Sequence, residues 1–120
     1  MGATQQDIQR RTFTFACDIV RFCDRASGPR SVRKITNQLL DAGTSVGANV
    51  EEARSNQSPA DFAAKIYIAL KEAREARYWM RLLFACHPQL REQVAPLLGE
   101  SEQLVAILYT IAKNARPASK

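Results

Sequence analysis

The 120-residue sequence contains no long apolar run, and glycine, proline and cysteine are all scarce in it. No window approaches the roughly 18 uncharged apolar residues that a membrane-spanning helix requires. Residues 1–11 also lack the apolar stretch of a secretory signal. We therefore expect a cytoplasmic protein that does not associate with a membrane.

Glycine and proline number only five each, which argues against a turn-rich all-β domain. Hydrophobic residues make up 46% of the chain and charged residues 24%, as is usual for a globular protein. A chain of this length is too short to build two independent cores. We expect residues 1–120 to form a single domain.

Residue types that carry catalysis or bind metals are also scarce. The one histidine, His87, precedes a proline and is more typical of a helix C-terminal cap than of a base or ligand. The cysteines, Cys17, Cys23 and Cys86, are odd in number and follow no metal-binding spacing, so reduced, buried thiols are expected. These shortages predict a protein that is not an enzyme and holds no metal or cofactor.

Apolar residues recur at helical spacing in four stretches. Ser58 and Pro59 favour the start of a helix, whereas Gly28 and the proline after it favour the end of one. Pro96 predicts either the start of the last helix or a kink in a longer one. The predicted helices span about residues 4–26, 31–54, 59–86 and 96–115. Their short connectors imply an all-α fold, an antiparallel up-down-up-down four-helix bundle.

The first two predicted helices carry broad apolar faces. Phe13, Cys17, Val20 and Cys23 widen the apolar stripe of the first helix. In the second helix, Gly43 and Gly47 lie one turn apart among other small residues. Such a patch predicts the close approach of another backbone.

Two polar side chains near the apolar faces need partners. Asn49 interrupts the apolar seam of the second helix, and Arg77 points close to the bundle face of the third. Glu51 and Glu52 are the natural candidates to pair with Arg77. We predict a structural polar cluster of Asn49, Glu51, Glu52 and Arg77, with a partner from another subunit as the alternative.

The third predicted helix has two apolar groups when its residues are placed at 100° intervals. The first faces the bundle and consists of Phe62, Ile66, Ala69, Leu70, Ala73, Ala76, Met80 and Leu83. The second lies roughly opposite and consists of Ile68, Trp79, Leu82 and Cys86, with Glu72 and Glu75 among them. Exposed apolar stripes mark contacts, so we predict an oligomer interface at the second group. The alternative is that a connector or residues 89–95 fold over it.

A line of cations and tyrosines lies between these two groups. It consists of Tyr67, Lys71, Arg74, Tyr78 and Arg81, at alternating spacings of four and three. Cations can contact phosphates and aromatic rings can stack on bases. The 17 Lys+Arg exceed the 12 Asp+Glu to give a net charge of +5, which permits a polyanionic partner. The line predicts a nucleic-acid-binding surface; the alternatives are a solvated flank or pairing with neighbouring acids.

A specific pattern occupies residues 38–53 (QLLDAGTSVGANVEEA) and 61–83 (DFAAKIYIALKEAREARYWMRLL). It resembles the 23S rRNA intervening-sequence protein family, small bacterial four-helix-bundle proteins. The resemblance covers about residues 8–115 and implies a homopentamer without established enzymatic activity. It implies bundle and interface roles for Ser45, Gly47, Asn49, Glu51, Glu52, Lys71, Glu72, Arg74, Glu75, Arg77, Tyr78 and Trp79. A distant relative, the accessory variability determinant of diversity-generating retroelements, binds nucleic acid and a reverse transcriptase.

These observations lead to three functional hypotheses. The first is a non-enzymatic homo-oligomer, pentameric as the resemblance implies, that binds RNA or DNA through a basic face. The second is a protein–protein adaptor, such as an accessory subunit of a reverse transcriptase in a diversity-generating retroelement. The third is a metal or small-molecule site among Glu51, Glu52, Glu72 and Glu75.

Overall fold

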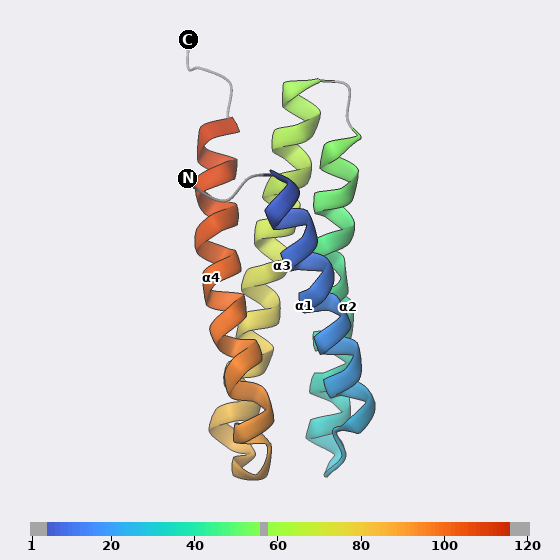
Figure 1. The fold of residues 1–120 in the computed structure, drawn as a ribbon. Helices are drawn as coiled ribbons and strands as arrows, with labels where there is room; N and C mark the ends of the chain where they lie inside the picture. Colours follow the sequence, from blue (N-terminus) through green and yellow to red (C-terminus); the bar gives the residue numbers. More distant parts are fainter. Residues whose placement is uncertain (1–4, 56–57, 116–120) are drawn as a thin grey trace.

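A computed structural model describes residues 5–55 and 58–115, which form four long α-helices. The helices are α1 (Gln5–Arg25), α2 (Arg30–Arg54), α3 (Pro59–Cys86) and α4 (Arg91–Ala115), with a 3-10 turn (Pro88–Leu90) before α4. The described residues contain no β-strand. Figure 1 shows that each helix runs antiparallel to the one before it. The predicted all-α, up-down-up-down bundle is therefore confirmed.

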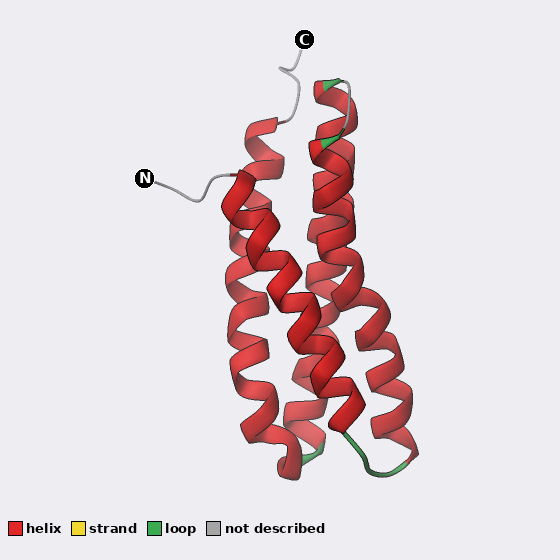
Figure 2. Ribbon diagram, turned by 45° about the vertical axis from the view of Figure 1, so that its right-hand side comes forward, coloured by secondary structure: helices red, strands yellow, loops and turns green. Residues whose placement is uncertain are grey.

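The helices lie along the long dimension of a body that measures 50 × 26 × 24 Å. The connections are confined to the two ends of the bundle (Figure 2). Extensive contacts join α1 to α2, α2 to α3 and α3 to α4, whereas α1 meets α4 over a much smaller area. Both views show α1 inclined across the other helices. The four-helix ring thus closes most weakly between its first and last members.

One hydrophobic core contains side chains from all four helices, among them Phe15, Leu39, Met80 and Leu108. Burial of each such side chain contributes about 1.5 to 3 kcal/mol to folding. The predicted bundle face of α3 is confirmed, because all its members are buried except Phe62, which is half-buried. Periodicity alone therefore identified the side of α3 that builds the core.

Gly43 and Gly47 allow α1 to approach α2 closely, as their spacing predicts. A β-carbon on Gly47 would lie 3.2 Å from the backbone oxygen of Thr12, and one on Gly43 would lie 3.0 Å from side-chain carbons of Ile19. A side chain at either position would require its neighbour in α1 to shift by a few tenths of an ångström. The two glycines set the distance between these helices.

Phe13 and Val20 lie outside the core, so the prediction that they widen the apolar stripe of α1 is wrong. Their side chains are 64% and 38% exposed. Phe13 lies instead at the edge of the contact between α1 and α2, where it is one of the residues that line a groove beside Gly47.

The two ends of α3 follow the local signals in the sequence. At its start, the Ser58 hydroxyl accepts a hydrogen bond of 3.1 Å from the Asp61 N–H. At its end, His87 is the C-cap, and its N–H donates to the Leu83 carbonyl at 2.9 Å. The His87 ring nitrogen Nε2 also lies 3.0 Å from the hydroxyl of Ser31 at the start of α2. The predicted capping role of His87 is confirmed.

The last helix begins at Arg91, earlier than the predicted range 96–115. Pro96 lies inside α4, where it has no N–H to donate and costs about 3 kcal/mol. However, Leu90 and Val94 are buried, and each contributes about 1.5 to 3 kcal/mol. Their burial offsets the lost backbone bond, so the predicted start at Pro96 is wrong, and the alternative of a longer helix that contains Pro96 is the one that forms.

Candidate nucleic-acid interface

One flank of α3 carries the predicted line of cations and tyrosines, which we call the basic flank: Tyr67, Lys71, Arg74, Tyr78 and Arg81. All five residues are exposed. Spacings of three and four hold them on one side of the helix. Within residues 5–55 and 58–115, none of the three cations forms an ion pair or a hydrogen bond. Their charges therefore face solvent without a described partner.

A groove of about 160 Å³ lies between the basic flank and α4, and is lined by Tyr67, Leu70, Tyr109, Ala112 and Lys113. Tyr109 and Lys113 lie one turn apart on α4, and Tyr109 is 51% exposed. Sequence analysis missed both residues. The available signal was their four-residue spacing outside the apolar stripe of the last helix. The structure thus extends the basic flank onto a second helix.

The predicted interface residues form a stripe along the other flank of α3: Ile68, Glu72, Glu75, Trp79 and Leu82. Only Ile68 is exposed, at 37%, and the other four are half-buried. Trp79 packs against the core, and its Nε1–H donates to Glu75 Oε2 at 3.2 Å. The Trp79 ring also meets the Tyr78 ring edge to face, with 5.3 Å between centroids.

This stripe lies beside α2, which corrects the prediction that it lies opposite the bundle face. The pKa of Glu72 is raised, first by burial and then by the negative charges of Glu75 and of Asp41 on α2, while Lys71 acts in the opposite direction. Lys65, on the same side of α3 as Ile68 and Glu72, pairs with Glu52 of α2 at 2.6 Å, so this side of α3 adjoins α2. The two flanks of α3 therefore differ in character: one is apolar and acidic, the other basic and aromatic.

The predicted polar cluster does not form. The Asn49 side-chain amide donates to the Ser45 carbonyl at 2.8 Å, and Glu52 pairs with Lys65 at 2.6 Å. Arg77 is half-buried and has no ionic partner among the residues described. Antiparallel packing sets Lys65 opposite Glu52, and Arg77 lies about 18 Å farther along α3 at 1.5 Å per residue. The distance along α3 prevents the predicted contact.

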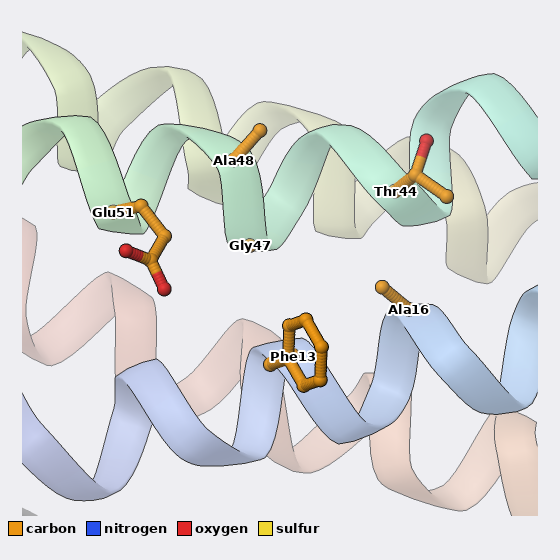
Figure 3. Close-up of a pocket in the computed structure, with 6 residues that line it drawn as sticks. All are labelled: Phe13, Ala16, Thr44, Gly47, Ala48 and Glu51. Carbon is orange, nitrogen blue, oxygen red and sulfur yellow. The ribbon is translucent and has the colours of Figure 1, made fainter.

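Glu51, the fourth residue of that predicted cluster, faces α1 across a second groove of about 320 Å³ (Figure 3). The groove is lined by Phe13, Ala16, Thr44, Gly47, Ala48 and Glu51. Figure 3 shows the Phe13 ring between the two helices next to Gly47, with the Glu51 carboxylate extending toward α1. Apart from Glu51 and Thr44, the lining is apolar.

No three His, Cys, Asp or Glu side chains in the described ranges gather closely enough to hold a metal ion. Glu51 and Glu52 lie on α2, and Glu72 and Glu75 lie on α3, without forming one site. None of the helices in the described part of the chain is long and apolar enough to cross a membrane.

The family model described as 23S rRNA-intervening sequence protein matches residues 4–110 of the sequence. The chain belongs to this family. The match reaches into all four helices, so it includes both flanks of α3 and most of α4.

A similar solved structure is that of a protein of unknown function from the S23 ribosomal protein family of Bacteroides thetaiotaomicron. It shares 35% sequence identity with this chain and superposes on it with a TM-score of 0.80. The alignment covers 91% of this chain and 97% of the other. No protein with curated annotation matches the chain.

The two segments that carry the family pattern lie side by side in this 23S rRNA-intervening sequence protein. Residues 38–53 belong to α2 and residues 61–83 to α3, the two helices with the most extensive mutual contact. The pattern therefore contains both the glycines at which α1 packs closely on α2 and the residues of the basic flank.

Proposed function

We propose that this protein is a non-enzymatic, cytoplasmic homo-oligomer, pentameric in form, that binds RNA or DNA through the basic flank. One observation carries the proposal. Lys71, Arg74 and Arg81 are exposed on one side of α3 and have no ionic partner among the described residues. A surface cation without a partner is free to replace a counterion on a phosphate.

The binding mechanism is electrostatic. Phosphate contacts by lysine and arginine release condensed counterions, so affinity falls as salt concentration rises. Five copies, each with a net charge of +5, carry about +25 in total, which attracts a polyanion before contact. The slope of log affinity against log salt concentration is expected to become shallower by about 2 to 3 for each bound protomer when three phosphate contacts are removed.

The test is fluorescence anisotropy with labelled RNA and DNA at about 50 and about 200 mM salt. The variant Lys71→Glu/Arg74→Glu/Arg81→Glu is expected to lose binding and salt dependence while keeping its helical content and mass. A matched control is Arg25→Glu/Arg30→Glu/Lys34→Glu, which reverses three exposed cations at the end of α1 and the start of α2, on other helices than the basic flank. Equal losses in both variants would refute the assignment to the basic flank and leave only an effect of net charge.

The proposed oligomer is supported by the half-exposed stripe along α3, which leaves apolar surface open beside α2. Trp79 is a poor site for a test because it also packs against the core. Ile68 is 37% exposed, so Ile68→Glu is expected to reduce the mass measured by light scattering without unfolding the bundle. Ala106→Glu, at an exposed position of α4, is the control. A wild-type monomer, or an unchanged mass for Ile68→Glu, would contradict the proposal.

The second candidate is a protein–protein adaptor, and the groove between α1 and α2 favours it. Phe13 is 64% exposed beside an apolar wall, a feature typical of protein contacts. The partner considered is the reverse transcriptase of a diversity-generating retroelement. Phe13→Asp is expected to abolish binding to a purified reverse transcriptase of such a retroelement, whereas the basic-flank variant retains it. Unchanged binding by Phe13→Asp would exclude this groove as the docking site for the enzyme.

A further inference from the structure

The chain contains three tyrosines, and all three are exposed on α3 or α4. The exposed fractions are 64% for Tyr67, 50% for Tyr78 and 51% for Tyr109. None of them belongs to the hydrophobic core. The tyrosines therefore contribute a surface of aromatic rings rather than packing within the bundle.

Two of these rings flank the groove between α3 and α4. Tyr67 comes from α3 and Tyr109 from α4, and the groove between them measures about 160 Å³. Its floor is apolar, because it consists of Leu70 and Ala112, which are 2% and 4% exposed. Within the described ranges neither ring meets another aromatic ring or makes a hydrogen bond, so both rings can receive a ligand.

Cations lie beside this groove, which we call the slot, on both helices. Lys113 lines it directly, and Lys71 lies one turn after Tyr67 on the basic flank. One acid, Glu102, lies two turns before Tyr109 on the same side of α4. The aromatic sides and apolar floor suit a flat apolar ring, and the cations at the rim suit negative charges on the backbone to which that ring is attached.

We infer that the slot between Tyr67 and Tyr109 stacks an unpaired nucleobase, so that the basic flank binds single-stranded nucleic acid in preference to duplex. This inference rests on the proposed function and names its substrate class. In a duplex the base faces are covered by neighbouring bases, so a tyrosine ring reaches one only where the strand is unpaired. Lys71 and Lys113 then contact the phosphates on either side of the stacked base.

The experiment compares single-stranded RNA, single-stranded DNA and a duplex of the same sequence, by anisotropy at fixed salt. Wild-type protein is expected to bind both single strands more tightly than the duplex. Tyr109→Ala is expected to weaken single-strand binding by about 5- to 160-fold, the range for loss of one stacked base, and to leave duplex binding within about twofold. Tyr109→Phe keeps the ring and is expected to bind as wild type does.

A second readout uses only the wild-type protein, in case a variant misfolds. An oligonucleotide that carries 2-aminopurine is expected to lose fluorescence when its base stacks in the slot. Unchanged 2-aminopurine fluorescence on binding, or equal loss of duplex and single-strand affinity in Tyr109→Ala, would overturn the stacking site.

Failure of this inference is distinguishable from failure of the proposed function. If duplex and single strands bind equally, and the triple charge variant abolishes both, the basic flank stands and the stacking site is rejected. If wild-type protein binds no nucleic acid under any condition, both are rejected.

Discussion

The backbone oxygen of Thr12 in α1 lies only 3.2 Å from the position that a β-carbon would occupy on Gly47 in α2. This oxygen belongs to a helical backbone, which cannot move away from a new β-carbon as the end of a flexible side chain can. Gly47 is therefore a spacer between two helices, although it lies inside a helix where glycine costs about 1 kcal/mol relative to alanine.

Gly47→Ala and Gly99→Ala are expected to have opposite effects on stability. Gly99 lies in α4, and nothing lies within 4 Å of a β-carbon built there. Gly99→Ala is therefore expected to stabilise the protein by about 1 kcal/mol. Gly47→Ala gains the same helix propensity but must push α1 away from α2, so its net effect is expected to be zero or destabilising. Thermal and urea unfolding provide the comparison, and equal stabilisation by both changes would contradict the close packing.

The ion pair between Arg11 and Glu100 is expected to stabilise the contact between α1 and α4. Its two hydrogen bonds are 3.0 Å (Nε to Oε2) and 2.7 Å (Nη2 to Oε1), and they raise the pKa of Arg11. Both side chains are about one-third exposed, so a double-mutant cycle is expected to give a coupling of about 0.5 to 1 kcal/mol that weakens with salt.

The control cycle for that measurement uses Arg21 and Asp18, a more exposed pair within α1 joined by one contact of 3.3 Å. Its coupling is expected to be smaller, below about 0.5 kcal/mol. If the two cycles gave the same coupling, the pair between α1 and α4 would have no special role.

The ionisation of Glu72 is expected to lower the free energy of unfolding as pH rises. Burial is the main cause that raises its pKa above the ordinary value of 4.5. The unfolded chain therefore loses this proton at lower pH than the folded chain does. The free energy of unfolding consequently falls as pH rises from the ordinary value through the raised one.

Glu72→Gln removes this cost and is expected to raise Tm at pH 7 by about 1 to 2 °C. The gain is expected to vanish below about pH 4, where both states carry the proton. Glu102→Gln, at an exposed site on α4, is the control. An equal gain at all pH values would show that charge at Glu72 is not the cause.

The thiol of Cys23 is expected to react slowly. It is half-buried, its Sγ lies 3.5 Å from the Thr36 carbonyl, and burial, aided by the charge of Asp24, raises its pKa to about 11. At pH 8 the thiolate fraction is then about 100-fold lower than for a thiol at the ordinary 9.0. Pulsed alkylation read by mass spectrometry is expected to label the exposed Cys86 long before Cys23. Similar rates for both in the folded protein, as expected only in denaturant, would contradict this.

Helix periodicity was sufficient to predict the fold, because the same residues that repeat along α3 are those that the core buries. It failed at Pro96, where a rule about local backbone geometry competed with the burial of Leu90 and Val94. It failed again at Phe13, because the sequence does not show how far α1 leans onto α2.

The candidate site was predictable only within one helix. The residues of the basic flank share a side of α3 by helix geometry alone, so their exposure followed from the pattern. Tyr109 and Lys113 belong to α4, and their position beside Tyr67 depends on how two antiparallel helices are aligned. The alignment of α2 with α3 likewise separates Arg77 from Glu52. The relative alignment of two helices cannot be derived from the spacing of residues along one of them.

The small contact between α1 and α4 has a consequence for how the bundle opens. The remaining three helices share the two most extensive interfaces of the molecule, α2 with α3 and α3 with α4. Detachment of α1 is therefore expected to need less free energy than complete unfolding, and amide hydrogens along α1 are expected to exchange faster than those along α3. The expected opening unit is thus α1 alone, which would separate from α2 along the contact at Gly43 and Gly47 while α2, α3 and α4 stay packed together.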